Sequence, residues 1–468
     1  MSTELWRWSA TDLAKAIREK KVSSQEVVQA HLDRITAVND SLNAVTIVLA
    51  EEALQMAAAA DKAVAAGDEL GPLHGVPVTV KENIDLTGTA TTQGVPAFAQ
   101  AVPPVDAPHI TQMKKAGVIP IGRTNLPEFG LRWHTDNDLR GATRNPWDAS
   151  RTPGGSSAGE AVALATGMTP LGLGNDYGGS LRWPSQCSGT AAIRPTLGRV
   201  PYASALAPAE DMLTLQLFGV QGPMARHVKD LRVALAAMSG ADPRDPWWTP
   251  APLSGPAGAK PIKVAVTKDP GGLGVDTAVA AGIDKAAQAL ADAGYKVEEI
   301  EPPLVAEAHG MWAHLATTEI NTLVLPMIQP IISADSGTFL QIVSELYPPL
   351  DLAGYAFTLA DRNRAARAWA QFLAEYPIVI GPVSARLPFK VGGDLQKESL
   401  AEFVTSLRLV TTMSLLGLPA AVVPVGVIDG LPQGVQIIGA RYREDMCLDA
   451  AEAIEQQLGV VTPIDPKW

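Results

Sequence analysis

Apolar residues recur along the chain with two alternating periods, which predict helices and strands in turn. Helical spacing predicts two helices within residues 9–38, each behind an N-cap serine, and a further helix over 51–66. Valines at every second position predict a strand over 76–81 that ends at Lys81. The other predicted strands are 43–49, 118–124, 262–267, 295–300, 377–382, 417–426 and part of 431–445, and the other predicted helices are 108–115, 158–167, 226–239, 278–293 and one that closes the chain.

Strands alternate with helices near both ends of the chain, which predicts an α/β layer fold. The apolar runs 417–426 and 431–445 have the composition of buried central strands, so early and late segments are expected to share one sheet. A proline- and glycine-rich stretch at 241–261 has the composition of a linker. The segment 303–375 is predicted to be mostly helical.

Charge and hydropathy narrow the classes of partner. The chain has 37 Lys and Arg against 49 Asp and Glu, a net charge of −12, which argues against a nucleic-acid or anionic-membrane partner. Its most apolar long window, 410–428, is broken by Pro419 and Pro424, so we expect no membrane span. The N-terminal residues include Glu4 and lack the apolar core of a secretory signal. We therefore expect a cytoplasmic protein.

Cysteine and histidine positions predict neither disulfides nor a metal site. Cys187 and Cys447 lie far apart in the sequence and belong to no C-x-x-C pair, which suits a reducing compartment. The seven histidines form no H-x-x-x-H pair. We expect no metal and no cofactor.

Two serine-bearing glycine turns, Gly154–Ser157 and Gly178–Ser180, flank the predicted helix 158–167. Glycines before a serine allow backbone N–H groups to gather around a presented hydroxyl, and such donors can stabilise an oxyanion beside a nucleophile. The helix between the turns should make the two serines neighbours in space. The alternative is that both turns are ordinary strand–helix loops in which serine acts as a cap.

Lys81 follows an apolar strand, and two interpretations are open for it. A lysine at a strand end usually extends to solvent. A partly buried lysine instead has a lowered pKa, because desolvation disfavours the ammonium form, and can then act as a base.

These motifs resemble those of a known family. The sequences GGSSAG (154–159), GNDYGGSLRWP (174–184) and RPTLGRVP (194–201) resemble the signature block of the amidase signature family of serine hydrolases. The sequence GVPVTVKENID (75–85) is similar to the segment that carries the catalytic lysine in that family. The resemblance covers most of the chain and is weak over 240–400. Departures include Ala158 for glycine, Asn175 for Thr or Ser, and Arg194 where lysine is common.

The resemblance implies a fold and a set of roles. The fold would be one large mixed β-sheet flanked by helices on both faces, forming a single amidase domain over 1–468 in which 303–375 covers the active site. Ser180 would be the nucleophile, Lys81 the base, and Ser156 the bridging serine, preceded by a cis peptide bond. The backbone N–H groups of Tyr177, Gly178, Gly179 and Ser180 would form the oxyanion hole, and Asp176 and Arg182 would brace the loop.

The resemblance also implies an amidase that cleaves a small amide, with aryl or aralkyl amides as candidates, and a homodimer as one possible assembly. Candidate pocket residues are Trp133, His134, Asp136 and Trp183; the loop residues among them could equally pack the loop. Three alternatives stay open: a preference for esters or carbamates, a glutamine amidotransferase subunit with partner chains, and a binding protein without activity. A fourth assigns Ser157 as the nucleophile of a G-x-S-x-G elbow, but that motif must follow a strand, and NPWDASRTP is not one.

Overall fold

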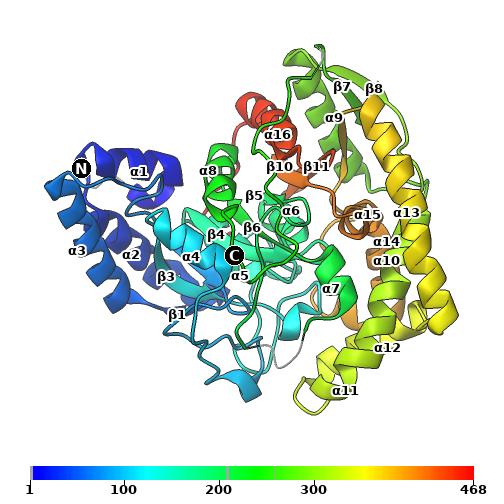
Figure 1. The fold of residues 1–468 in the computed structure, drawn as a ribbon, viewed down its shortest axis with the longest axis horizontal. Coiled ribbons are helices and arrows are strands. Elements are labelled where there is room, and N and C mark those ends of the chain that lie inside the picture. Colours follow the sequence, from blue (N-terminus) through cyan, green and yellow to red (C-terminus); the bar gives the residue numbers. More distant parts are fainter. Residues whose placement is uncertain (1–3, 207–209, 259) are drawn as a thin grey trace.

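One mixed sheet of eleven strands runs through the part of the protein that the computed structural model describes, residues 4–206, 210–258 and 260–468. The strands are β1 (Val45–Val48), β2 (Pro77–Lys81), β3 (Ile119–Thr124), β4 (Leu171–Asp176), β5 (Ala191–Arg194), β6 (Val220–Ala225), β7 (Lys263–Val266), β8 (Lys296–Glu299), β9 (Ile378–Pro382), β10 (Ala420–Ile428) and β11 (Leu431–Gly439). They lie in the order β1-β3-β2-β4-β6-β5-β10-β11-β9-β7-β8 (Figure 1).

Helices pack on both faces of this sheet, as predicted. They are α1 (Ala10–Arg18), α2 (Ser24–Leu42), α3 (Ala50–Ala66), α4 (Pro108–Lys115), α5 (Ala158–Ala165), α6 (Arg182–Ser188), α7 (Leu213–Phe218), α8 (Val228–Met238), α9 (Thr277–Asp292), α10 (Val305–Glu319), α11 (Leu325–Ile328), α12 (Ala334–Leu346), α13 (Leu352–Glu375), α14 (Lys397–Ser406), α15 (Arg408–Leu416) and α16 (Glu444–Leu458). Short 3-10 turns occupy Leu5–Arg7, Pro96–Phe98, Glu128–Gly130 and Gly393–Leu395, and a π-helical turn, Ile320–Val324, joins α10 to α11.

Apolar cores pack on both faces of the sheet, and two of them meet at β10. Alternate residues of β10 divide between the two cores: Ala421 and Val423 pack with α8, α9 and α16, whereas Ala420 and Val422 pack with α10, α13 and α15. This division follows from the period of two in a strand, where neighbouring side chains point to opposite faces. A strand buried on both faces reads as a continuous apolar run, which is why 417–426 is so apolar.

Strands β2 and β4 bring Lys81 and the second glycine turn, Gly178–Ser180, to one edge of the sheet. They pair in parallel, with Thr79 opposite Gly172, so both strands end on the same side. Strand β2 ends at Lys81, and β4 ends at Asp176, immediately before the second glycine turn. Valines 78 and 80 enter one core, and Thr79 and Lys81 point to the other face, toward α5.

Strands on both sides of the linker-like stretch 241–261 belong to the same sheet, since β1–β6 precede it and β7–β11 follow it. The single-domain assignment stays a prediction. The segment 303–375 is mostly helical, as expected, and forms α10 to α13, which lie together at the right of Figure 1.

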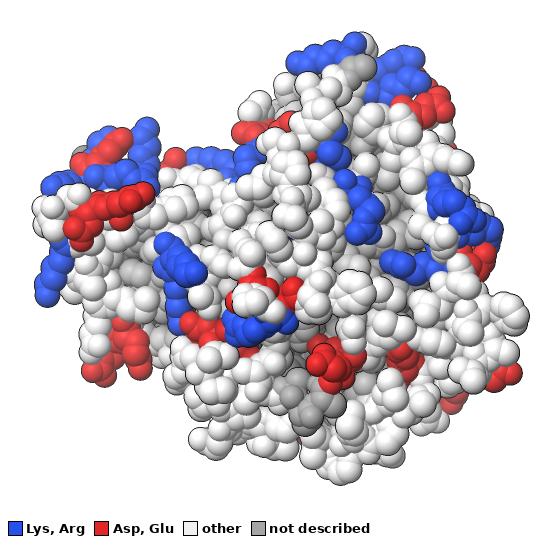
Figure 2. Space-filling model, in the orientation of Figure 1, with Lys and Arg blue, Asp and Glu red and all other residues white. Residues whose placement is uncertain are grey.

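The surface in Figure 2 carries basic and acidic side chains in small intermingled groups, with wide neutral areas between them. Among the residues that the structure describes, no helix is long and apolar enough to cross a membrane.

Candidate active site

The amine of Lys81 lies inside the protein and contacts two polar side chains. The residue is 0% exposed. Its Nζ lies 2.7 Å from Ser156 Oγ and 2.7 Å from Asn175 Oδ1. The first interpretation of Lys81, a side chain extended to solvent, is therefore wrong, because the edge of the sheet is covered by α5 and by the first glycine turn.

Burial lowers the pKa of Lys81 from 10.5 to about 7, although the carboxyl groups of Asp176 and Glu160 act in the opposite direction. A lysine with this pKa is largely neutral at slightly alkaline pH and can accept a proton there. The environment of Lys81 thus supplies the condition that a base requires.

The two glycine turns meet, as the sequence predicts. The amide of Ser157 donates to the carbonyl of Ser180 at 3.2 Å, which places the second turn directly beside the first. Ser156 is 2% exposed and Ser180 is 7% exposed. The Gly155–Ser156 peptide bond is cis.

Two glycines, one in each turn, occupy positions where a side chain would not fit or would be strained. A Cβ added at Gly155 would lie 2.7 Å from the carbonyl oxygen of Arg132. Gly179 has φ +104°, a conformation that L side chains rarely adopt. Each turn therefore requires a glycine directly before its serine.

Asp176 is the centre of a buried ionic cluster that holds the second turn. Arg182 binds both of its carboxylate oxygens, at 3.0 Å and 2.9 Å, and Arg194 contributes a third contact at 3.1 Å. The carboxylate also accepts the amides of Gly179 at 2.9 Å and Leu181 at 3.2 Å. Burial alone would raise the pKa of Asp176, but the two guanidinium groups hold it well below its usual range.

Arg182 extends this cluster to the C-terminal half of the chain. Its Nη1 donates to Val410 O at 2.8 Å and to Gln436 Oε1 at 2.6 Å, and its Nη2 donates to Ser414 Oγ at 3.0 Å. The contacts of Asp176 and Arg182 fit the expected bracing. The part played by Arg194 was missed, although an arginine in the apolar strand AAIR is itself a signal of a buried ion pair.

The side chains proposed for a substrate pocket lie mostly in the packed interior. Trp133 donates its indole N–H to Gly178 O at 2.9 Å, and so contacts the backbone of the second turn. Trp183 is 0% exposed and donates to Trp133 O at 3.1 Å, which fits packing in the interior; its assignment to the pocket wall stays a prediction. His134 is buried and contacts Thr152, which fits loop packing, and Asp136 is partly exposed on the same loop.

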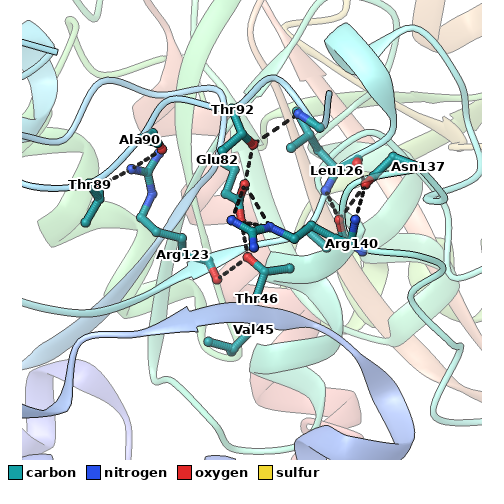
Figure 3. A network of polar contacts seen from close by, with 12 residues as sticks. Val45, Thr46, Glu82, Thr89, Ala90, Thr92, Arg123, Leu126, Asn137 and Arg140 are labelled. Carbon is teal, nitrogen blue, oxygen red and sulfur yellow. Dashed lines mark hydrogen bonds and ion pairs between the residues drawn. The ribbon is translucent and has the colours of Figure 1, made fainter. Parts of the chain in front are cut away.

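A second polar network, formed around Arg123 and Glu82 (Figure 3), contacts the backbone next to Lys81. The guanidinium of Arg123 donates to the carbonyl oxygens of Val80, Lys81 and Ile84 at 3.2, 3.0 and 2.7 Å. The neighbouring Glu82 accepts hydrogen bonds from Thr46, Thr92 and Arg140. This network orders the turn after β2, and therefore the backbone from which the Lys81 side chain extends.

Glu160, in the first turn of α5, is a fully buried carboxyl group near the lysine. It accepts from Thr79 Oγ1 at 2.5 Å and from Thr124 Oγ1 at 2.7 Å. Burial raises its pKa to about 7, against the effects of these hydrogen bonds and of Lys81 and Arg123. Sequence reasoning missed this residue, although a glutamate inside the apolar helix AGEAVALA is a visible signal.

The surroundings of Ser157 do not match a nucleophile elbow. No strand precedes it in the described residues 125–156. Its hydroxyl donates to Asn175 O at 3.4 Å. The downstream histidines contact other groups: His227 contacts Glu455, His309 contacts Thr411 and Tyr347, and His314 contacts Pro348.

Within the described part of the chain, no group of three or more His, Cys, Asp or Glu side chains is arranged so that it could hold a metal ion. The expected absence of a metal and of a cofactor stays a prediction.

Comparisons with known proteins agree with the fold and with these motifs. Residues 26–448 match the family model described as Amidase. The indoleacetamide hydrolase of Bradyrhizobium diazoefficiens is 46% identical over 459 residues, which span 98% of this chain and 88% of that protein. A glutamyl-tRNA(Gln) amidotransferase subunit of Moorella thermoacetica is 32% identical over 483 residues, which span 97% of both proteins. The crystal structure of a bacterial aryl acylamidase of the amidase signature enzymes superposes with a TM-score of 0.82 at 26% identity and 96% coverage of both chains.

The chain therefore belongs to the amidase family, with the α/β fold of the amidase signature enzymes. It is an amidase, a hydrolase that acts on the carbon–nitrogen bond of an amide.

Proposed function

We propose that this amidase works through Ser180 as nucleophile, Ser156 as proton relay and Lys81 as base. The observation that carries the proposal is the buried amine of Lys81, 2.7 Å from Ser156 Oγ, beside the turn that presents Ser180. Neutral Lys81 takes the Ser156 proton while Ser156 takes the proton of Ser180, and Ser180 Oγ forms a bond to the amide carbon. Lys81 then returns its proton to the leaving nitrogen as the C–N bond breaks. Water hydrolyses the resulting ester and releases the acid.

The negative oxygen of the tetrahedral intermediate needs donors that are not already engaged. The amide of Gly179 donates to Asp176, so we assign the oxyanion hole to the amides of Tyr177, Gly178 and Ser180. This revises the expectation that Gly179 takes part. Asp176 keeps the turn in shape through its bonds to Gly179 and Leu181.

We propose a primary amide of an arylacetic acid as the substrate class. Aromatic side chains surround the second turn: the ring centroids of Tyr177 and Trp312 lie 5.6 Å apart, and those of Trp133 and Trp312 lie 6.2 Å apart. We propose that a flat acyl group would pack against these rings beside Ser180. The 46% identical relative is named for indoleacetamide, which belongs to this class.

Covalent labelling tests the catalytic assignment. A fluorophosphonate should modify Ser180, and Ser180→Ala should abolish both labelling and turnover. Ser157→Ala is the matched control and should still be labelled on Ser180. An adduct located on Ser157 by mass spectrometry would refute the assignment.

A hydrolysis panel tests the substrate class. Indole-3-acetamide and phenylacetamide should be cleaved with release of ammonia, with kcat/KM above that for acetanilide, for phenylacetate esters and carbamates, and for glutamine. A higher kcat/KM for an ester or a carbamate would overturn the preference. Glutamine hydrolysis that depends on co-purified partner chains would instead favour a role in an amidotransferase complex. Homodimer formation and a cytoplasmic location stay predictions, which sedimentation and cell fractionation can test.

A further inference from the structure

Asn175 connects the proposed base to the turn that follows β2. It is the penultimate residue of β4 and is partly exposed. Its Oδ1 accepts from Lys81 Nζ at 2.7 Å, and its Nδ2 donates to Asn83 Oδ1 at 3.0 Å. In this arrangement the oxygen of the Asn175 amide, and not its nitrogen, faces the lysine, and the nitrogen faces Asn83.

This contact restricts the amine because of what each atom can do. A neutral lysine amine has two N–H groups and one lone pair. The carbonyl oxygen of Asn175 can only accept, so it takes an N–H and cannot compete for the lone pair. Ser156 Oγ, the other partner at 2.7 Å, can donate to that lone pair.

We propose that Asn175 is a positioning residue that orients the Lys81 amine so that its lone pair points at Ser156. This inference rests on the proposed roles of Lys81 and Ser156. Threonine or serine, which the resemblance gives as usual here, carries a hydroxyl that can either donate or accept. The amide removes that ambiguity, and it reaches Asn83 as well.

A substitution at position 175 can also change the charge next to the Lys81 amine, and so its pKa. The charged groups that face Lys81 are Asp176 at the end of β4 and Glu160 on α5, and both raise its pKa. Asn175→Asp would add a third carboxylate at the position of the present 2.7 Å contact. An opposite charge at this range raises the pKa of a base by roughly one to three pH units. Asn175→Leu would instead remove an acceptor that favours the ammonium form, which lowers the pKa.

The test is the pH dependence of fluorophosphonate labelling of Ser180, which reports the base of the free enzyme without a substrate. In Asn175→Asp the rise should move to a pH higher by roughly one to three units, with the limiting rate retained, since the oxygen acceptor remains. In Asn175→Leu the limiting rate should fall roughly 10- to 100-fold, and the rise should not move upward. A merely structural role would lower the rates and leave the midpoint of the rise unchanged.

Asn83 provides a matched pair that leaves position 175 intact. Asn83→Asp keeps an acceptor for Asn175 Nδ2 and should retain the limiting labelling rate. Asn83→Leu frees the amide to turn and should lower that rate in the same way as Asn175→Leu. Circular dichroism establishes that each variant is folded, and the Asn83 pair decides if Asn175→Leu fails to fold.

Two results would overturn the inference: an unchanged midpoint in Asn175→Asp, or a full limiting rate in both leucine variants. The proposed function would survive either result if Ser180 is still the labelled residue and Lys81→Ala abolishes labelling. If the label lies elsewhere in the unaltered enzyme, the proposed function itself fails.

Discussion

Lys81→Met should make the protein more stable at and below neutral pH while it removes activity. Methionine has a similar length and carries no charge. A pKa lowered from 10.5 to about 7 corresponds to about 5 kcal/mol of unfavourable free energy for the folded ammonium form. The hydrogen bonds to Ser156 and Asn175 offset about 1 to 3 kcal/mol of this. The expected net gain in the free energy of unfolding at pH 6 is therefore about 2 to 4 kcal/mol.

The gain should depend on pH in a defined direction. Between pH 7 and 10.5 the unfolded chain keeps a proton on Lys81 that the folded chain has released, so the stability of the unaltered protein rises with pH over this window. The difference between Lys81→Met and the unaltered protein should shrink by about 1.4 kcal/mol per pH unit there. Near pH 10.5 only the lost hydrogen bonds remain, and the variant should be the less stable protein.

Urea unfolding from pH 6 to 10 measures this difference. Glu160 also titrates, with a pKa of about 7, and the loss of Lys81 would shift it further upward. The comparison is therefore made in a Glu160→Gln background, where the lysine is the only member of the pair that titrates. A difference that stays constant from pH 6 to 10 would falsify the lowered pKa, and with it the proposed base.

Three further changes test other parts of the site. Ser156→Ala should lower kcat/KM by roughly 10²- to 10⁴-fold, and the double variant with Lys81→Ala should be little worse than the worse single variant, because members of one relay are not additive; multiplicative losses would contradict the relay. Trp133→Phe removes the indole donor to Gly178 O and should lower kcat by up to roughly tenfold with KM little changed; a selective rise in KM would mean that Trp133 acts in substrate binding instead. Asp176→Asn should lower the free energy of unfolding by about 3 to 5 kcal/mol, measured by urea unfolding, because Arg182 and Arg194 lose a buried counter-charge; an unchanged midpoint would show that the cluster contributes little.

The sequence predicted well those elements whose pattern is local. The strand that ends at Lys81 and the helix between the two glycine turns were both expected, and the structure places them at 77–81 and 158–165. The amide of Ser157 at the carbonyl of Ser180 confirms that the two turns meet. Strands β4 and β6 were not predicted, because glycines and a proline interrupt their apolar pattern and pairing in the sheet decides their conformation.

The parts of the site that escaped prediction depend on contacts across long separations in the chain. Arg194 and Glu160 lie in apolar segments, and only the fold shows that they face Asp176 and the threonines beside Lys81. Asn175 was visible only as a departure from the family pattern. Its partner Asn83 lies 92 positions away, and no local period reports such a pairing. The burial of Trp183 was not foreseen either, because an aromatic residue beside a serine turn can line a pocket or fill the interior.

The hydrogen bonds of Arg182 to the C-terminal half of the chain have a consequence for the order of events during synthesis. Its acceptors Val410 and Gln436 lie 228 and 254 positions further along the chain. At typical translation rates of about 5 to 20 residues per second, Gln436 is added roughly 13 to 50 seconds after Arg182. Until then the Arg182 guanidinium, which pairs with Asp176, lacks its full set of acceptors. The second glycine turn of the nascent chain is therefore incompletely ordered. A ribosome-bound chain that stops before Val410 should therefore be inert toward the fluorophosphonate, and reactivity should appear only once the last strands have joined the sheet.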